Sequence, residues 1–473
     1  MRVLSVASEC VPLVKTGGLA DVAGALPGAL AGVGVDMRVL LPGYPSVLRA
    51  LPEAREVLTF DSLYSGPARI LAAEARGLRL YVLEAAHLYE RPGTLYLDPQ
   101  GRDWEDNPER FAALSRAGAE IALGRCDWQP DVVHGHDWQA GFLPYFLDRD
   151  GIEVPSVLTV HNIAFAGFAA PSRIDRLGLQ RRDFHSEGYE YWGQVSALKA
   201  GLVWADRITT VSPRYAQELT TPEFGMGFDG LIRKRQADLV GILNGIDTRI
   251  WDPTRDTAIR RFRGWRTKAA ATAALRDEMG LPQSDGPLAV VISRLTEQKG
   301  LDLLLRAIPD FLDSGGQLVL LGSGDQGLEA AWRDAADRHQ GLSVTIGYDE
   351  TLSHRMMAGG EAVLVPSRFE PCGLTQLYGL RYGTIPVVAR VGGLADTVID
   401  ANHAALKAGA ATGLVHPPDD ERALALALSR LSGLYRDGET WPRMVRNAMR
   451  HPVGWDGSAT EYADLYRGLA PAA

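Results

Sequence analysis

Residues 362–398 restrict the possible folds of this chain more than any other stretch. They open with four apolar residues closed by Pro366, a run typical of a strand buried on both faces of a parallel sheet. A polar turn follows at 367–373, and from Leu374 apolar residues recur at helical spacing until Gly383. A second apolar run, 385–389, leads into a glycine pair. The stretch predicts a strand-helix-strand unit with its chemistry at the end of the first strand.

The start of this predicted helix favours an anion. The N–H groups of Gly373, Leu374 and Thr375 would point out of the helix start, where backbone dipoles attract phosphate. Glu370 lies in the turn just before the helix. We therefore expect the turn and the helix start to form part of a ligand site.

The glycine pair has an echo near the start of the chain. Residues 15–22 read Lys-Thr-Gly-Gly-Leu-Ala-Asp-Val, and residues 390–397 read Arg-Val-Gly-Gly-Leu-Ala-Asp-Thr. In the first copy the glycines would let a ligand approach the backbone, and Lys15 adds a mobile positive charge. Either loop alone is better explained as a tight turn between a strand and a helix. Two copies together favour two domains of one kind, whose facing sides form a cleft for a phosphorylated ligand.

The length and the order of the elements support two domains. A chain of 473 residues exceeds one ordinary core. Short apolar runs alternate with helical patterns along the chain, which indicates α/β domains with parallel, helix-covered sheets. The turn signal at 244–247 marks the boundary. We expect a first domain at 1–243, completed by a last helix at 456–473 that crosses back to it, and a second domain at 244–455.

Composition excludes several classes of protein. The chain is 46% hydrophobic and 23% charged, and no apolar run approaches the roughly 18 residues that span a bilayer. Glu9 and Lys15 interrupt what could be taken for a secretion signal. Three scattered cysteines fit neither a disulfide framework nor a zinc site. The net charge of −9 speaks against nucleic-acid binding. We expect a soluble, cytoplasmic protein without a membrane or nucleic-acid partner.

Histidines follow two predicted strands of the first domain. His134, His136 and Asp137 end the run that starts at 131, and His161 ends the run that starts at 156. Parallel strands deliver such side chains to one edge of the sheet. Their spacing is not a recognised set of metal ligands, so we favour hydrogen bonds to a polar ligand over a metal.

Candidate ligand residues in the second domain also follow strands. Arg294 and Lys299 come after the run 288–292 and before a helix, where two cations could hold a diphosphate; surface turn residues are the alternative. Tyr348 follows the run 343–346 and could stack on a base, although a structural tyrosine is commoner. The Gly-Ser-Gly turn at 322–324 is too short a fingerprint for a dinucleotide oxidoreductase.

Six motifs, in this order, resemble bacterial glycogen synthases and plant starch synthases. They cover nearly the whole chain: Lys15 to Val22, His134 to Gly141, Thr159 to Asn162, Asn244 to Asp247, Ser293 to Gly300, and Pro366 to Tyr378. The resemblance implies two facing Rossmann-like domains of the GT-B type with a deep cleft between them. It also implies transfer of glucose from ADP-glucose to the 4-hydroxyl at the non-reducing end of an α-1,4-glucan, with retention of the α configuration.

The resemblance assigns donor contacts to matched positions. Arg294 and Lys299 would hold the diphosphate of ADP-glucose. The other donor contacts would be Lys15 and the Gly18 backbone from the facing domain, the amides of Gly373, Leu374 and Thr375, and the Tyr348 ring on the adenine.

It also assigns contacts to the sugars. Glu370 would accept hydrogen bonds from the glucose hydroxyls at C3 and C4. His161 would contact the sugar near C6, and its backbone carbonyl could face the anomeric carbon. Asp137 and Asp21 would lie near the acceptor or the reacting centre, and Tyr96 would contact the acceptor.

The sequence leaves the mechanism and several alternatives open. No spacing supplies the two carboxylates, roughly 5 Å apart, that double displacement needs, so we favour substitution on one face of the sugar. We expect no metal and no cofactor besides the co-substrate, because the only Asp-x-Asp, at 148–150, resembles a solvated turn. A related transferase that uses UDP-glucose or a small acceptor, and a non-catalytic glucan-binding protein, are the alternatives. The oligomeric state is not predicted.

Overall fold

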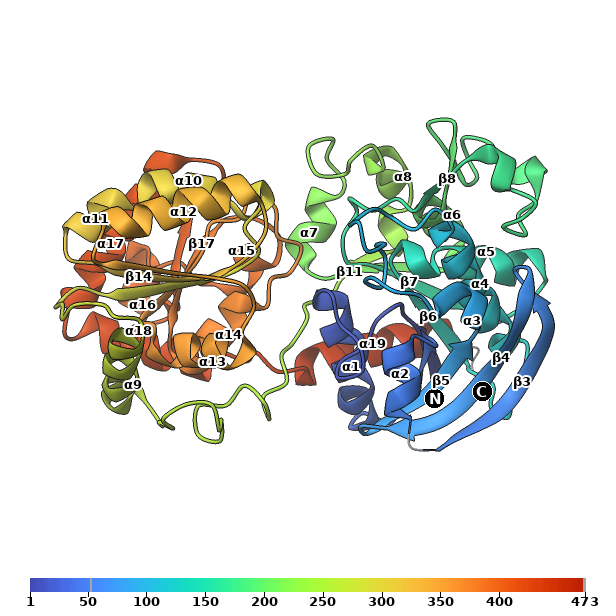
Figure 1. The fold of residues 1–473 in the computed structure, drawn as a ribbon, viewed down its shortest axis with the longest axis horizontal. Coiled ribbons are helices and arrows are strands. Elements are labelled where there is room, and N and C mark those ends of the chain that lie inside the picture. The colour runs from blue at the N-terminus through green and yellow to red at the C-terminus, as the bar shows by residue number, and fades with distance from the viewer. Residues whose placement is uncertain (52, 471–473) are drawn as a thin grey trace. The chain divides into compact units, whose positions relative to one another are not determined.

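The computed structural model describes residues 1–51 and 53–470 as two compact units. The first unit comprises Met1–Asn244 and Trp455–Ala473, and the second comprises Gly245–Gly454. These divisions fall beside the turn at 244–247 and beside the last helix (Figure 1).

The first unit is built on a sheet of nine strands, counted over the described residues. From β12 to β5 all neighbouring strands are parallel. The spatial order is β12 (Leu239–Gly241), β11 (Arg207–Thr210), β7 (Ser156–Val160), β6 (Val132–His136), β1 (Arg2–Val6), β2 (Asp36–Pro42), β5 (Leu78–Glu84), β4 (Gly66–Ala75) and β3 (Ala54–Leu63). The predicted α/β class is confirmed.

One edge of this sheet differs from the expected parallel arrangement. β3, β4 and β5 are antiparallel neighbours. Two-residue turns join them, at Tyr64-Ser65 and Arg76-Gly77, and all four residues have positive φ. Such turns match the twist of antiparallel strands and close tight hairpins, so no crossover helix is formed here. β3 was not predicted, because most of its side chains are exposed and it lacks a buried apolar run.

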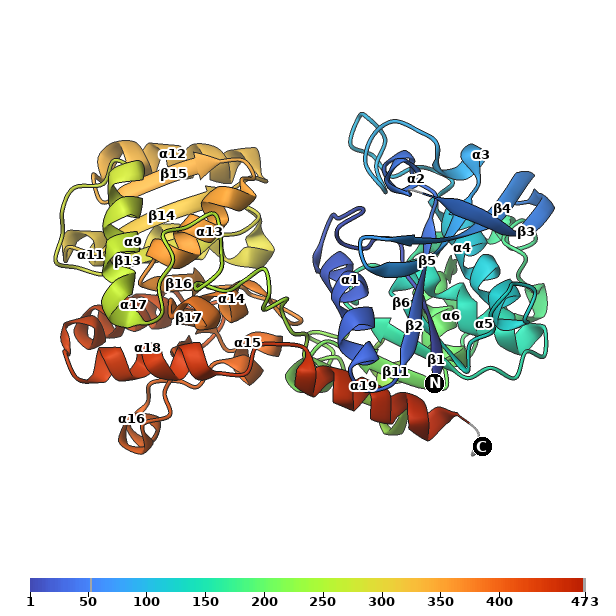
Figure 2. The same ribbon diagram turned by 90° about the horizontal axis from the view of Figure 1, so that it is seen from below.

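Helices cover both faces of the first sheet. The last helix, α19 (Asp456–Leu469), lies beside α1 (Gly18–Ala31), where the buried rings of Tyr462 and Tyr466 pack in one cluster with Val3 and Leu26 (Figure 2). The other elements of this unit are α2 (Pro45–Ala50), α3 (Ala86–Tyr89), α4 (Asn107–Ala122), α5 (Phe142–Arg149), α6 (Ala197–Trp204), α7 (Pro213–Glu218), α8 (Asp229–Lys234) and a small sheet of β8 (Phe168–Ala169), β10 (Gln194–Ser196) and β9 (Glu190–Tyr191).

The second unit has a fully parallel sheet. Alternate side chains of one strand enter different cores: Ala289 and Val291 pack on one face, and Leu288 and Val290 on the other. The strand order is β15 (Leu342–Ile346), β14 (Gln317–Gly322), β13 (Leu288–Ile292), β16 (Ala362–Val365), β17 (Ile385–Ala389) and β18 (Leu414–His416).

The helices of the second unit lie on both faces of this sheet (Figure 1). They are α9 (Trp265–Glu278), α10 (Leu301–Ala307), α11 (Pro309–Asp313), α12 (Gln326–Arg338), α13 (Glu350–Gly359), α14 (Thr375–Tyr382), α15 (Gly392–Thr397), α16 (His403–Ala408), α17 (Glu421–Arg436) and α18 (Thr440–Arg450). Over the described residues of both units, none of the helices combines the length and the apolar character needed to span a bilayer.

Each sheet reverses its strand order once. In the second unit the chain runs outward from β13 to β15, then returns to β16 and runs outward the other way; in the first unit the reversal lies between β1 and β6. Loops at the carboxyl ends of the two strands diverge at such a point and leave room for a ligand. The predicted site residues that follow β13, β16 and β6 therefore lie where a doubly wound sheet places its ligands.

Candidate functional site

An ion pair marks the reversal point of the second sheet. Lys299 follows β13 and Glu370 follows β16, and Lys299 Nζ lies 2.6 Å from Glu370 Oε2. Their side chains are only 17% and 10% exposed. Ser367 Oγ donates a second hydrogen bond, 2.9 Å long, to the same oxygen. Glu370 Oε1 accepts no hydrogen bond from the described part of the chain, so this oxygen can still receive one.

The backbone brings these two loops together. The Arg368 N–H donates to the Gln298 carbonyl at 2.9 Å, and Gln298 Nε2 donates back to the Phe369 carbonyl at 3.1 Å. Gly300 has φ +65°, and a Cβ there would lie 2.1 Å from the Pro366 carbonyl oxygen. Only a glycine permits this approach, which sets Lys299 opposite Glu370.

Arg368 connects the same two loops through several hydrogen bonds that the sequence did not predict. Its guanidinium donates to both carboxylate oxygens of Asp302, at 2.6 and 2.9 Å, to the Glu297 carbonyl and to Asp419. These hydrogen bonds to Arg368 lower the pKa of Asp302 to about 2. Arg368 is therefore occupied in holding the two loops together.

The remaining donor residues predicted in this unit lie on neighbouring loops. The Arg294 side chain is exposed and forms no ion pair with the residues described. Tyr348 follows β15 and is 77% exposed. Leu374 is the N-cap of α14, which begins at Thr375, and Gly373 adopts φ +72° just before it. The helix start thus lies directly after the Glu370 turn, as its sequence indicated.

The second glycine pair packs closely against the turn that carries Glu370. A Cβ on Gly392 would lie 2.0 Å from the Glu370 carbonyl oxygen, and one on Gly393 would lie 2.3 Å from that of Cys372. The Gly393 N–H also donates to the Pro371 carbonyl at 3.0 Å. The glycines of this copy therefore support the turn that carries Glu370, while a ligand cleft formed by the two copies stays a prediction.

The first glycine loop is open. No atom lies within 4 Å of a Cβ built on Gly17 or Gly18, and α1 begins at Gly18. Lys15 Nζ lies 2.8 Å from Asp21 Oδ1, one turn into that helix, with side chains 45% and 23% exposed. The structure thus brings Lys15, Gly18 and Asp21 together around an accessible helix start.

Glu9 holds this loop through hydrogen bonds, a role that the sequence analysis did not predict. Its 4% exposed carboxylate accepts hydrogen bonds from the Thr16 N–H, the Thr16 hydroxyl and the Gly17 N–H. The Tyr96 hydroxyl donates to Glu9 Oε1 at 3.1 Å and lies 2.8 Å from Ser8 Oγ. The hydroxyl of Tyr96 is thus engaged inside the protein, while contact of Tyr96 with an acceptor stays a prediction. The signal available in the sequence was an acidic residue three positions after the apolar run that forms β1.

The histidines form a buried chain at the reversal point of the first sheet. His136 Nε2 lies 3.0 Å from Ser5 Oγ, and His136 Nδ1 lies 3.0 Å from His161 Nε2. Burial lowers the pKa of His136 to about 3 and that of His161 well below its usual value, so both rings are neutral at pH 7. Among the described residues, no group of three His, Cys, Asp or Glu side chains is arranged to hold a metal.

His134 has a structural position. Its Nδ1 lies 2.7 Å from the Tyr466 hydroxyl of α19, its Nε2 lies 2.5 Å from Thr159 Oγ1, and its side chain is fully buried. The expectation that His134 bonds a ligand is wrong, because both ring nitrogens are occupied inside the protein. The sequence could not show this, because Tyr466 is 332 residues away along the chain.

Asp137 fixes the backbone of His161. Its Oδ1 accepts hydrogen bonds from the N–H groups of His161 and Asn162, at 2.6 and 3.3 Å. Asp137 itself has φ +54°, an unusual conformation for a residue with a side chain. Burial raises its pKa to about 7, against the lowering effect of the two hydrogen bonds.

Comparison with known proteins decides the family. Residues 2–234 match the family model described as the starch synthase catalytic domain, and residues 286–433 match that of glycosyl transferases group 1. The chain is 58% identical over 471 residues to the glycogen synthase of Paracoccus denitrificans, covering 99% of each chain. The chain belongs to the glycogen synthase family of glycosyltransferases. The glycogen synthase of Jannaschia sp. is 56% identical over 470 residues, again 99% of each chain.

Solved structures place this glycogen synthase family member in the GT-B fold. The catalytic domain of Starch Synthase IV from Arabidopsis thaliana, bound to ADP and acarbose, matches 99% of both chains with a TM-score of 0.87 and 31% identity. Sucrose-phosphate synthase from Thermosynechococcus elongatus matches 99% of this chain and 98% of its own, with a TM-score of 0.62 and 19% identity, and supports the fold alone. The chain is thus an enzyme, and its residues at the two reversal points are the candidates for its active site.

Proposed function

We propose that this enzyme transfers glucose from ADP-glucose to the 4-hydroxyl at the non-reducing end of an α-1,4-glucan, with retention of configuration. The observation that carries the proposal is the Lys299–Glu370 pair at the reversal point of the second sheet. The relatives named glycogen synthase support it, as does the plant starch synthase that carries ADP.

Charge is the first requirement of this reaction. Breaking the bond between glucose and phosphate leaves negative charge on the departing diphosphate, and fixed cations stabilise it. In the proposal Arg294 and Lys299 supply those cations. Lys299 has three N–H donors, and Glu370 takes one of them, so the ammonium can also reach a phosphate oxygen.

Recognition of the glucose follows from the same pair. Lys299 and Ser367 hold Glu370 through Oε2, which fixes the direction of Oε1. Oε1 is then available to accept hydrogen bonds from the hydroxyls at C3 and C4. A carboxylate held in this way need not reorganise when the sugar binds, which strengthens the contact.

Asp137 fixes the direction of the His161 carbonyl, for which we propose a role in the reaction. Because the N–H and C=O of a trans peptide point in opposite directions, the hydrogen bond from the Asn162 N–H to Asp137 turns the His161 carbonyl away from Asp137. We propose that this oxygen faces the anomeric carbon as positive charge develops there. The His161 side chain, held by His136, would contact the sugar near C6.

The other contacts complete the proposal. Lys15 and the Gly18 amide would assist the diphosphate, together with the amides of residues 373–375, and Tyr348 would stack on the adenine. Asp21 and Asp137 would lie near the acceptor or the reacting centre. We further propose substitution on one face of the sugar without a metal or other cofactor. We also propose a cytoplasmic enzyme, a location supported by Cys10 and Cys126, which form no disulfide.

The proposal is tested by comparing two donors. The purified chain is given glycogen and radiolabelled ADP-glucose or UDP-glucose, and β-amylase then releases the added glucose as maltose if the new linkages are α-1,4 at non-reducing ends. We expect faster incorporation from ADP-glucose, unchanged by EDTA. Preference for UDP-glucose, transfer to a small acceptor alone, or binding of glycogen without transfer would each contradict the proposal.

A further inference from the structure

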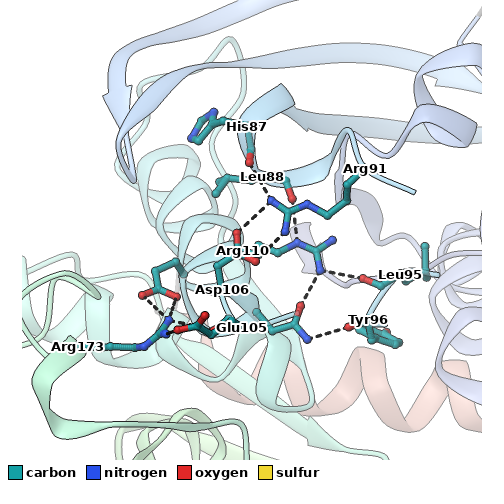
Figure 3. Close-up of polar contacts among 11 residues, drawn as sticks. His87, Leu88, Arg91, Leu95, Tyr96, Glu105, Asp106, Arg110 and Arg173 are labelled. Atoms are coloured by element: carbon teal, nitrogen blue, oxygen red, sulfur yellow. Dashed lines mark hydrogen bonds and ion pairs between the residues drawn. The ribbon is translucent and has the colours of Figure 1, made fainter. Parts of the chain in front are cut away.

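A network of buried polar contacts extends from α4 to the glycine loop of the first unit. It involves the segment 88–107, which carries Tyr96 (Figure 3). None of its members belongs to the motifs that indicated the family. The network nevertheless ends on Glu9, whose carboxylate holds Thr16 and Gly17.

Arg110 lies at the centre of this network. The side chain is 1% exposed, and burial lowers its pKa from the ordinary arginine value. Burying a guanidinium is costly unless its donors are satisfied. Its Nε donates to the Leu88 carbonyl at 2.9 Å, and one terminal nitrogen donates to the Leu95 carbonyl at 3.0 Å and to Asn107 Oδ1 at 2.6 Å. Arg110 therefore fixes the backbone on the N-terminal side of Tyr96.

The side chains of Asn107 and Arg91 hold the rest of the segment. Asn107 Nδ2 donates to the Tyr96 carbonyl at 3.0 Å. Arg91 donates to both oxygens of Asp106, at 2.7 and 3.0 Å, and its guanidinium lies 4.7 Å from the centre of the Trp104 ring. Figure 3 shows these contacts converging on the loop from both of its ends. Tyr96 is thus held through its own carbonyl and through its neighbour Leu95.

The Tyr96 side chain carries this constraint to Glu9. Its ring lies 5.8 Å from that of Phe111, and its hydroxyl reaches both Ser8 and Glu9. Burial raises the pKa of Tyr96 well above its ordinary value, so the hydroxyl keeps its proton and donates a hydrogen bond to the carboxylate. Glu9 then has one donor from the loop that carries Tyr96 and others from the glycine loop.

We propose that Glu9 and Tyr96 are positioning residues that set the conformation of the glycine loop for the donor's diphosphate, with Arg110 holding Tyr96 in place. The inference rests on the proposed use of Lys15 and the Gly18 amide as donor contacts. Glu9 takes the N–H groups of Thr16 and Gly17 and so leaves the helix start at Gly18 as the accessible end. Loss of a donor to a buried carboxylate lets the loop shift, and small displacements of binding groups cost large factors in rate.

Tyr96→Phe tests this inference, because it removes the hydroxyl and keeps the ring. Hydrogen bonds to charged groups are strong, so we expect the KM for ADP-glucose to rise roughly tenfold. The KM for glycogen should stay unchanged, and amide exchange at residues 15–18 should become faster. Glu9→Gln, which keeps the shape and removes the charge, should change both readouts more. Tyr189→Phe is the matched control, since its buried hydroxyl donates to the Gln180 carbonyl at 2.7 Å.

The outcomes separate this inference from the proposed function. A raised KM for glycogen with an unchanged KM for ADP-glucose would place Tyr96 at the acceptor and overturn the inference. Unchanged amide exchange at residues 15–18 in Tyr96→Phe and Glu9→Gln would overturn it as well. Exchange is measured without any ligand, so it remains decisive even if the wild-type chain fails to use ADP-glucose, a result that would contradict the proposed function instead.

Discussion

The two Gly-Gly-Leu-Ala-Asp loops share a sequence but not an environment. Gly17 and Gly18 face open space, whereas Gly392 and Gly393 lie against the backbone of Glu370 and Cys372. In the first loop the glycines leave the helix start accessible. In the second loop the glycines allow close packing against the turn that carries Glu370. An internal repeat therefore shows that two units are related, but it does not show that both copies bind the same group.

The two units also differ in where their candidate ligand-binding cations lie and in how exposed these cations are. In the first unit Lys15 pairs with Asp21 near the surface, on the glycine loop itself. In the second unit the corresponding Arg390 is exposed. The cation at the reversal point is Lys299, which is 17% exposed, comes from a different loop and pairs with Glu370. We infer that the second unit supplies the fixed charge of the reaction and that the first adds a mobile one.

Substitution of Lys299 should have the largest effect on activity. Lys299→Met takes away a donor aimed at the departing diphosphate and leaves Glu370 without its ion-pair partner. Loss of one such preorganised contact costs roughly 10²–10³ in rate, so kcat should fall by that factor while circular dichroism stays unchanged. Lys407→Met, an exposed lysine of α16, is the matched control. A loss below threefold would show that Lys299 does not act on the leaving group.

Alanine substitutions should separate the two glycine loops. Gly392→Ala places a Cβ 2.0 Å from the Glu370 carbonyl oxygen at φ +41°, so urea unfolding should show a loss of roughly 1–3 kcal/mol from the clash alone. Gly18→Ala meets no atom, so stability should be kept while the KM for ADP-glucose rises. The reverse pattern, a destabilised Gly18→Ala or an unaffected Gly392→Ala, would contradict the difference between the loops.

Asp137 should make stability depend on pH. Its pKa is about 7 in the folded chain, against roughly 4 when unfolded, so the folded state binds more protons between these values. The free energy of unfolding should therefore fall as the pH rises from 4 to 7, relative to Asp137→Asn. Asparagine keeps the acceptor for the His161 N–H and tolerates the positive φ. Parallel pH profiles for the two proteins would contradict the raised pKa.

The exposed pair of the first unit should contribute least to stability. Lys15 and Asp21 are 45% and 23% exposed, and such pairs contribute between about 0 and 1 kcal/mol. Lys15→Met should therefore change the free energy of unfolding by less than about 1 kcal/mol and still weaken donor binding. A larger loss of stability would show that this lysine is structural.

Local patterns predicted much of the fold. The runs 288–292, 362–365 and 385–389 are strands, because buried parallel strands are apolar along their whole length. β3 could not be predicted in this way, since its side chains are mostly exposed. The loop positions of Lys299, Glu370 and Tyr348 followed from the strand ends that precede them.

Contacts between distant residues could not be predicted from the sequence. The Lys299–Glu370 pair joins residues 71 apart, and the bond of Tyr96 to Glu9 joins residues 87 apart. Spacing gives no information at such separations. Glu9 and Arg110 also lack a distinctive motif, because their roles depend on burial and on backbone carbonyls that no pattern marks.

The central claim is that Lys299 binds the diphosphate of the donor. Binding of ADP tests it most directly, because it separates binding of the diphosphate from the chemical step. Isothermal titration of the wild-type chain and of Lys299→Met with ADP and with AMP compares a ligand that has the second phosphate with one that lacks it. Charge-assisted hydrogen bonds are strong, so we expect ADP to bind the variant roughly tenfold or more weakly, and AMP to bind both proteins alike. Equal ADP affinity for the two proteins would contradict the account.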